Sequence, residues 1–442
     1  MDRRVLLVSL ILFAGGATGV GVAVFAFVGL DDATTDAEVV WESSPAAGDD
    51  GSGAVVATVD GDPLILQPAI AESDDDADDA PDDDGGGMTG DADDEVTGDA
   101  DDGDEASLRA LDADGDVAWS TAVPGDVPSD GTSDLIVADV DGDPVVAFTT
   151  VTGSLVVLDA ADGTERFSTS VGTGAAITPA AVDLTDDGMP AFVAVDDGGT
   201  VVAVDETGDG IFETDLDGDG ALRPLAVAGD PDDGTSSDGG DDSRTLTDAG
   251  VAVLTEGTGA QHVTVVDAAG DVVWSEQPDG TTLSWNAADS RRGGILALGG
   301  TDGTLKTLEV SDGSPRYDVG LQDVPVDVGD ADAGRIHVGG IGDVWAVDLL
   351  DGEVVWKQQY GGEVRVNEPA VGDVTGDGTA EAVAVNRDGG LLAMNRNGEA
   401  VVRGDAGSVV VYARPLFADV TGDGTDEIVV VTDDGTVMAL RS

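Results

Sequence analysis

The sequence predicts an all-β protein, an eight-bladed β-propeller, because of a repeat, its period and the way the two ends of the chain complete it. The repeat joins a short apolar run, a turn rich in Asp and Gly, and a strand that ends in a large, mostly aromatic residue; its clearest copy covers 346–356. The third residue of the run falls, in turn, at Leu111, Leu158, Val204, Val266, Leu308, Val347, Met394 and Leu440. A period of about 40 to 50 residues is typical of propeller blades.

Each repeat contains four short segments that predict strands. In the seventh repeat they cover 368–374, 381–386, 391–395 and 399–402. Runs of Val, Ala and Leu between Gly and Asp residues favour antiparallel strands joined by tight turns. Helical periodicity is absent after residue 30. One repeat is therefore expected to form one four-stranded blade.

The eighth blade is expected to use both ends of the chain. The last apolar run, 436–440, lacks the strand with an aromatic ending, whereas Ala37–Trp41 has that ending and stands alone near the N-terminus. We expect these two pieces to pair in one sheet. Such pairing closes the ring and removes the free sheet edges of an open array.

The repeat resembles that of the pyrroloquinoline quinone (PQQ) type propellers. The resemblance is carried by Ala346, Asp348, Gly352 and Trp356, and it covers nearly all of the chain after Asp36. It implies that the tryptophan docks between neighbouring blades while Asp and Gly shape the turn. The docking residues expected from it are Trp41, Trp119, Trp274 and Trp356. The alternative role for these side chains is a surface on which a ligand stacks.

The N-terminal segment predicts a membrane anchor. Arg3 and Arg4 precede the uncharged stretch 5–30, whose 26 residues would form a helix ~39 Å long. That length crosses a hydrocarbon core of about 30 Å, and the basic pair places the acidic body outside the cytoplasm. The alternatives are a cleaved signal peptide, with an Arg-Arg pair of the twin-arginine type, and a buried soluble helix. The expected location is the cell membrane, with a single pass.

The chain divides into an anchor or signal at 1–30, a short linker at 31–36 and the propeller at 37–442. Two stretches of Asp, Gly and Ser, at 72–105 and 229–248, interrupt the repeat. Their composition predicts disordered acidic loop insertions. Neither is a domain boundary, because the repeat resumes after each.

The charge balance excludes one class of partner. Lys and Arg total 18 against 91 Asp and Glu, which gives a formal net charge of −73. Nucleic acid is not an expected partner, because its phosphates require cationic side chains.

Abundant Asp with scarce Lys looks like a protein from a salt-loving organism. At about 1 M salt the Debye length is roughly 3 Å, so carboxylates spaced over a surface hardly repel one another. Cysteine is absent, so disulfides and thiolate sites are excluded.

Two turns have the spacing of a calcium loop. They follow the pattern D-x-T-x-D-G-x-x-E at 373–381 and 419–427, and they resemble the calcium loops of FG-GAP repeats. Calcium takes about six to eight oxygen ligands, and Gly at position 6 allows the tight turn. The expected ligands are Asp373, Thr375, Asp377, Thr379 and Glu381 in one loop and Asp419, Thr421, Asp423, Thr425 and Glu427 in the other. The alternative is that both are solvated turns of an acidic protein.

Signals for enzymatic chemistry are weak. The only histidines, His262 and His337, fit structural positions, and no nucleophile elbow, P-loop or zinc spacing occurs. Quinoprotein dehydrogenases have PQQ-type propellers, but their adjacent cysteines are missing here, so PQQ is not an expected cofactor.

The leading hypothesis is a non-catalytic, membrane-anchored scaffold that binds a protein or an extracellular polymer and is stabilised by calcium. The alternatives are a PQQ-dependent or other enzyme sited in the central channel, and a calcium-dependent adhesion protein.

Overall fold

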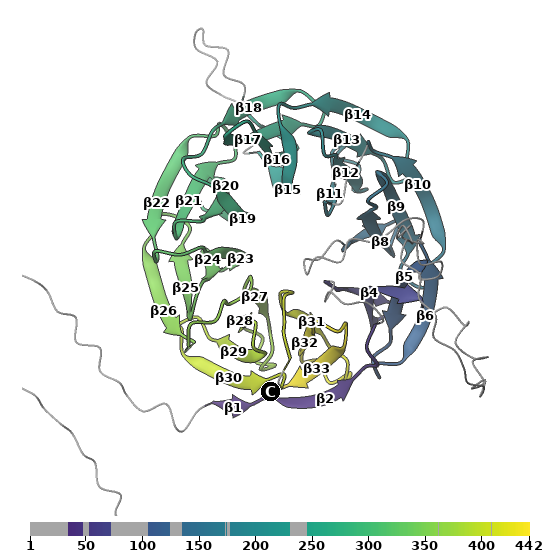
Figure 1. Cartoon of the computed structure of the whole chain (residues 1–442), viewed down its shortest axis with the longest axis vertical. Helices are drawn as coiled ribbons and strands as arrows, with labels where there is room; N and C mark the ends of the chain where they lie inside the picture. Colours follow the sequence, from purple (N-terminus) through teal and green to yellow (C-terminus); the bar gives the residue numbers. More distant parts are fainter. Residues whose placement is uncertain are drawn as a thin grey trace, which may run out of the picture. The chain divides into compact units, whose positions relative to one another are not determined.

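The computed structural model describes residues 34–46, 53–71, 105–123, 135–229 and 245–442, except 173, 175, 176, 361 and 408. Within these residues the chain forms strands β1 to β33 and no helix. The strands build eight sheets arranged in a ring, each with one strand near the axis and one at the periphery (Figure 1). The predicted eight-bladed β-propeller is confirmed for this part of the chain.

In each of the first four blades, four antiparallel strands follow one another from the axis outward in chain order. Blade 1 contains β3 (Val55–Val59), β4 (Asp62–Ala71), β5 (Glu105–Leu111) and β6 (Val117–Ala122). Blade 2 contains β7 (Leu135–Val140), β8 (Asp143–Thr149), β9 (Ser154–Asp159) and β10 (Glu165–Ser170). Blade 3 contains β11 (Ala180–Val182), β12 (Ala191–Val195), β13 (Thr200–Val204) and β14 (Gly210–Asp215). Blade 4 contains β15 (Asp219–Ala228), β16 (Ala249–Gly257), β17 (Ala260–Asp267) and β18 (Val272–Glu276).

The remaining blades follow the same order, and the last one combines strands from both ends of the chain. Blade 5 contains β19 (Thr282–Ser290), β20 (Gly293–Gly300), β21 (Thr304–Glu309) and β22 (Pro315–Gly320). Blade 6 contains β23 (Asp327–Asp332), β24 (Arg335–Gly339), β25 (Asp343–Asp348) and β26 (Val354–Gln359). Blade 7 contains β27 (Ala370–Gly372), β28 (Glu381–Val385), β29 (Gly390–Met394), β30 (Ala400–Asp405) and β1 (Thr35–Asp36). Blade 8 contains β31 (Leu416–Ala418), β32 (Glu427–Val431), β33 (Val437–Arg441) and β2 (Glu38–Glu42).

The hydrophobic core lies between neighbouring blades. Every residue of β12, β28 and β32 is buried, because adjacent blades cover both faces of these strands. In outer strands such as β10, half-buried and exposed residues alternate, because one face of the strand meets solvent. Val145 of blade 2 and Phe192 of blade 3 share one cluster, and Ile65 of blade 1 shares another with Val429 of blade 8. The short apolar runs of the repeat are thus the middle strands.

Blade 8 closes the ring as the sequence predicts. β2 pairs antiparallel with β33, which places Val39 opposite Leu440 and Trp41 opposite Ala439. The segment predicted as a linker also contributes, because its short strand β1 pairs in parallel with β30 of blade 7. The strands β1 and β2 therefore form the outer edges of two neighbouring blades (Figure 1).

A buried polar cluster joins blade 1 to this closure. Gln67 Nε2 donates to Gly435 O at 2.8 Å, and Arg109 Nη2 donates to the same oxygen at 3.1 Å. The same Arg109 nitrogen donates to Ser44 O at 3.0 Å. Burial lowers the pKa of Arg109, and hydrogen bonds to several oxygens offset part of the cost of burying the charge. The segment that follows β2, the turn that precedes β33 and blade 1 therefore meet at this cluster.

Large side chains within the outer strands pack against a glycine of the next blade, and the strands continue beyond these residues instead of ending at them as the repeat predicts. The Trp119 ring lies over Gly163, and a Cβ added there would come within 2.6 Å of the ring. The same contact occurs at Trp41 with Gly115, Phe167 with Gly208, Phe212 with Gly270, Trp274 with Gly313, Tyr317 with Gly352 and Trp356 with Gly398. These seven glycines have φ between 71° and 87°, a conformation that other residues adopt only at a cost. Trp274 and Trp356 are 8% and 9% exposed, and Trp41 and Trp119 are half-buried.

Several expectations fall on residues that the structure does not describe. The predicted membrane span 5–30 lies outside the described residues, and no helix within them is long and apolar enough to cross a membrane. Most of the two predicted insertions, at 72–104 and 230–244, lies outside them as well. The end of the second insertion is described, and there Leu246 is buried in the core shared by blades 4 and 5.

Candidate functional site

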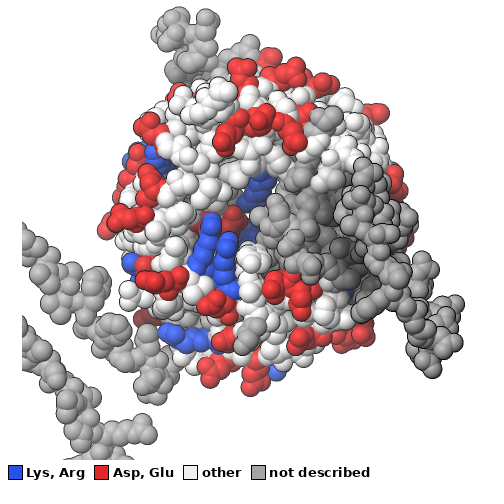
Figure 2. All heavy atoms as spheres, viewed as in Figure 1, with Lys and Arg blue, Asp and Glu red and all other residues white. Residues whose placement is uncertain are grey.

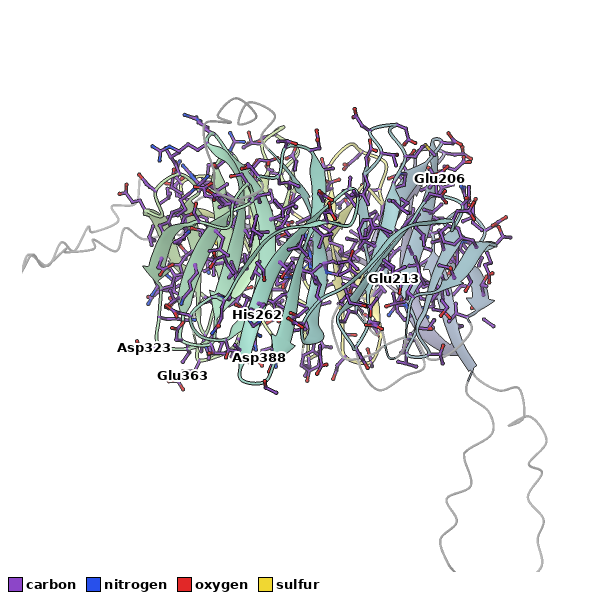
Figure 3. All side chains as sticks on the ribbon, turned by 90° about the horizontal axis from the view of Figure 1, so that it is seen from above. Glu206, Glu213, His262, Asp323, Glu363 and Asp388 are labelled. Atoms are coloured by element: carbon purple, nitrogen blue, oxygen red, sulfur yellow. The ribbon has the colours of Figure 1, made fainter. Side chains whose placement is uncertain are left out.

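The propeller has two faces that carry different segments. The connections between blades and the turns between second and third strands lie on one face, which we call the crossover face; Asp323, Glu363 and Asp388 mark it in Figure 3. The other turns lie on the opposite face, the turn face, which Glu206 marks. The predicted calcium loops belong to the turn face, because they join the first and second strands of blades 7 and 8.

The first predicted calcium loop is held by its own hydrogen bonds. The Asp373 carboxylate accepts two backbone N–H bonds from the loop, at 3.2 and 2.8 Å. Thr375 Oγ1 donates to Glu381 Oε2 at 3.3 Å, and Thr379 N donates to Asp377 Oδ1 at 2.8 Å. Glu381 begins β28 and is only 2% exposed. The structure therefore brings the five predicted ligands into one compact turn.

The second loop repeats this geometry. The Asp419 carboxylate accepts two backbone N–H bonds, at 3.0 and 2.9 Å. Thr421 Oγ1 donates to Glu427 Oε1 at 3.1 Å, and Thr425 N donates to Asp423 Oδ1 at 2.9 Å. Glu427 is fully buried and also accepts a backbone N–H bond at 2.9 Å. The shared spacing of the two sequences thus produces the same loop twice.

Buried carboxylates dominate the electrostatics of these loops. Burial is the main cause that raises the pKa of Glu381 and of Glu427. Asp426 of the second loop contacts the first: its N donates to Asp373 O at 3.4 Å, and burial followed by the charges of Asp373 and Asp419 raises its pKa. No local pattern of the sequence singles out Asp426.

The donors of the loops suit a hard cation, since they are carboxylate, hydroxyl and carbonyl oxygens. In the part of the chain that the structure describes, however, no three His, Asp or Glu side chains are grouped closely enough to hold a metal ion. The donor chemistry fits calcium, and the grouping that would surround the ion is not formed among these residues.

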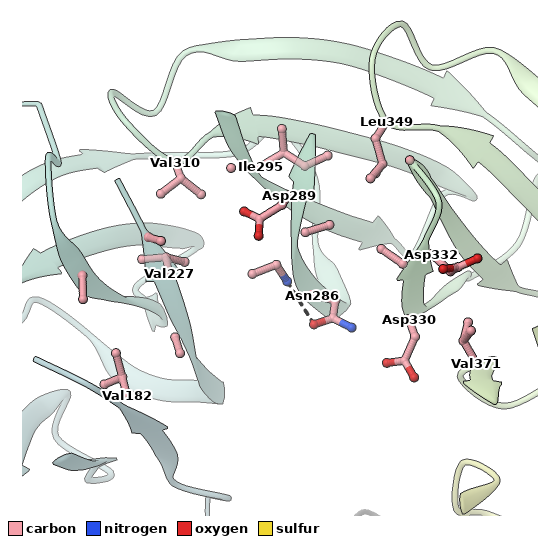
Figure 4. Close-up of a pocket in the computed structure, with 18 of the residues that line it drawn as sticks. Val182, Val227, Asn286, Asp289, Ile295, Val310, Asp330, Asp332, Leu349 and Val371 are labelled. Carbon is pink, nitrogen blue, oxygen red and sulfur yellow. Dashed lines mark hydrogen bonds between the residues drawn. The ribbon is translucent and has the colours of Figure 1, made fainter. Parts of the chain in front are cut away.

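A cavity of about 840 Å³ opens inside the ring between blades 3 and 7 (Figure 4). Its polar lining consists of Asp183, Asn286, Asp289, Asp330 and Asp332, and the rest is mostly Ala, Val and Gly. Asp289 and Asp330 point into the open space (Figure 4). Among the described residues that line it, none is aromatic, His, Lys or Arg. The charged groups of this described lining are therefore aspartates, of which Asp330 pairs with Arg414 and Asp332 with Arg396, and none of the described lining residues offers a ring on which a quinone or a sugar could stack.

Both histidines are built into strands, outside this cavity lining. His337 of β24 is buried, its Nδ1 lies 3.0 Å from Asp330 O, and burial lowers its pKa. His262 of β17 pairs with Thr255 of β16 (Figure 3). Each imidazole thus occupies a position set by sheet packing.

A third feature lies on the crossover face. Figure 2, which views the ring from this face, shows basic side chains gathered beside the central opening and acidic ones spread around the rim. We call five residues from the connections and turns of blades 6 to 8 the arginine strip: Ile341, Arg365, Arg387, Tyr412 and Arg414. Sequence patterns did not predict this strip. The sequence offered one signal that could have located it: cationic residues are rare in this chain, and three of the 18 Lys and Arg residues lie in the strip.

The fold defines the class of this protein, an eight-bladed β-propeller. A family model described as outer membrane protein assembly factor BamB matches residues 104–209, which belong to blades 1 to 3. None of the curated proteins compared matches the chain.

Solved structures share the fold at low sequence identity. Sqt1 of Chaetomium thermophilum, bound to the N-terminus of the ribosomal protein L10, is 14% identical with a TM-score of 0.61, over 92% of this chain and 100% of that chain. The computationally designed Ika8 protein is 15% identical with a TM-score of 0.58, over 91% and 98%. BamB from Moraxella catarrhalis is 17% identical with a TM-score of 0.49, over 76% and 88%. At these identities the likeness concerns the fold alone.

Proposed function

We propose that this chain is a membrane-anchored, extracytoplasmic scaffold whose propeller binds another protein and catalyses no reaction. One contrast carries the proposal. The cavity lining combines small apolar residues with carboxylates, whereas the crossover face exposes Ile341 and Tyr412 beside arginines. Aromatic residues and Arg are enriched at protein interfaces. Sqt1, which shares the fold, was solved with a segment of a protein partner, and this supports a protein over a polymer. The basic pair before 5–30 supports the anchor.

The scaffold and its anchor are tested on native membranes. After mild solubilisation at the native salt concentration, we expect the full chain to sediment as part of an assembly larger than its detergent-bound monomer. A variant without residues 5–30 is expected in the soluble fraction, because it has lost the apolar span. Sedimentation of the full chain as a monomer would contradict the scaffold. Retention of the truncated variant in the membrane would contradict the anchor.

We further propose that calcium binds the loops of blades 7 and 8 and stabilises the contact between them. The support is the set of oxygen donors at 373–381 and 419–427, the two buried glutamates, and the contact of Asp426 in the second loop with Asp373 in the first. The ion would supply positive charge where three carboxyl groups carry a desolvation cost. Its binding would draw each loop more tightly around one point.

Calcium binding is tested by calorimetric titration at high salt, together with thermal unfolding. We expect Asp377→Ala to lose the heat of one site and part of the calcium-dependent stabilisation, which is about 2.7 kcal/mol when free calcium is about 100 times Kd. Asp114→Ala is the matched control, because Asp114 is an exposed turn aspartate of blade 1. Equal heats in Asp377→Ala and the parent would leave the loop at 373–381 as a solvated turn.

A further inference from the structure

We propose that the arginine strip is a docking surface for an extended, acidic segment of a partner protein. This inference rests on the scaffold function proposed above and adds the face that binds and the chemistry of the segment that it recognises. Three features of the strip support it: its continuity across blades, the way its arginines are held, and the lack of an acidic partner for Arg387 among the described residues.

Backbone bonds join the strip into one surface across blades 6, 7 and 8. Ile341 forms an antiparallel bridge with Arg365, and Arg387 N donates to Arg365 O at 3.0 Å. Val411 N, in the connection that leads to blade 8, donates to Arg387 O at 3.1 Å. The buried Asn367 supports this connection, because its Nδ2 donates to two of its carbonyl oxygens, each at 3.0 Å. The strip is therefore held rigidly before any partner arrives.

Two arginines of the strip are oriented by aspartates of β23. Arg365 Nε donates to Asp327 Oδ2 at 2.7 Å, and Arg414 Nη2 donates to Asp330 Oδ2 at 2.6 Å. The two arginine side chains remain 34% and 26% exposed. A guanidinium has five N–H donors, so each still presents donors to an incoming acceptor. The aspartates fix the arginines in place without using all of their donors.

Arg387 differs from the other two. It forms no ion pair with a carboxylate of the described residues, while its Nε, like that of Arg414, is buried without a hydrogen-bond partner. Its guanidinium lies 5.0 Å from the centre of the Tyr412 ring. Tyr412 is 41% exposed and Ile341 is 36% exposed. An arginine stacked on an exposed tyrosine has the composition of an interface hot spot.

A segment that carries carboxylates is the occupant that these groups favour. A guanidinium binds a carboxylate through two parallel N–H···O bonds, and the exposed faces of Ile341 and Tyr412 can receive an apolar side chain between the acidic ones. An extended segment can follow a strip that crosses three blades. With a net charge of −73 over the whole chain, the long-range field of the protein repels an acidic segment, and this repulsion is largely screened at about 1 M salt, where the Debye length is roughly 3 Å. Recognition therefore depends on direct bonds to the three arginines.

The experiment uses the full chain in native membranes at native salt. A photo-crosslinking p-benzoylphenylalanine replaces Tyr412 or Ile341 on the strip, or Arg292, an exposed residue of the turn face. We expect both strip positions to crosslink to the same protein, through a segment with at least two Asp or Glu residues, and Arg292 to give no such adduct. With that protein purified, Arg387→Glu is expected to raise Kd about tenfold or more, whereas Arg292→Glu leaves Kd unchanged.

The outcomes separate this inference from the proposed function. Adducts that form only at Arg292, or a crosslinked segment without acidic residues, would overturn the acidic docking surface and leave the scaffold standing. Adducts at none of the three positions, with the chain sedimenting as a monomer, would contradict both. An unchanged Kd for Arg387→Glu would also overturn the inference. If circular dichroism shows that this variant is unfolded, Tyr412→Ser, which alters an exposed ring, replaces it with the same expected rise in Kd.

Discussion

Gly115→Ala is expected to lower the free energy of unfolding by about 3 kcal/mol, which combines the cost of a left-handed backbone with that of an overpacked contact. Gly115 has a φ of +81°, and a Cβ placed there would lie 2.6 Å from the Trp41 ring. This contact joins blade 8 to blade 1, where the N-terminal strand closes the ring. The measurement is urea unfolding followed by far-UV circular dichroism at constant high salt.

Two further variants separate the backbone cost from the contact. Gly61 has a φ of +97° and no atom within 4 Å of an added Cβ, so Gly61→Ala should cost only about 1 to 2 kcal/mol. Trp41→Ala removes the ring that blocks Gly115, so the double variant should lose less stability than the sum of the two single variants. Equal losses at Gly61 and Gly115, with strict additivity at Trp41, would show that this contact does not support the closure.

Transfer to low ionic strength is expected to unfold the propeller reversibly, with loss of its far-UV sheet signal. Asp and Glu outnumber Lys and Arg by 91 to 18, and acidic side chains surround the rim of the crossover face (Figure 2). Below about 0.1 M salt the Debye length exceeds roughly 10 Å, so neighbouring carboxylates repel one another and destabilise the compact state. The measurement is ellipticity during stepwise dialysis from molar salt and back.

The control for this prediction distinguishes screening from other effects of salt. Choline chloride at the same ionic strength as sodium chloride should preserve the sheet signal, because screening depends on ionic strength and not on the identity of the cation. Ellipticity that stays constant at low salt would overturn the interpretation of the composition as salt adaptation. Rescue by sodium but not by choline would point to specific ion binding instead.

Much of the fold could be predicted because its requirements are local. The strand β29 is an apolar run, the turn after it needs a glycine at 398, and the docking residue Trp356 lies within the outer strand of the preceding blade. The pairing of Val39 with Leu440 was also predictable, since a repeat that lacks its last strand is completed by an isolated matching one. The two acidic loops could be located because Asp, Thr, Gly and Glu recur at one spacing.

Taken alone, the sequence determined the number of blades, the closure of the ring and the loops at Asp373 and Asp419, because spacing and residue type specify these within a few positions. Only the tertiary structure decided that Asp426 of the second loop contacts the first loop, that Arg387 meets Tyr412 and that Ile341 pairs with Arg365. These contacts join different blades, and they depend on how each blade is rotated against the next. That rotation results from packing across the whole ring, so no short stretch of sequence records it.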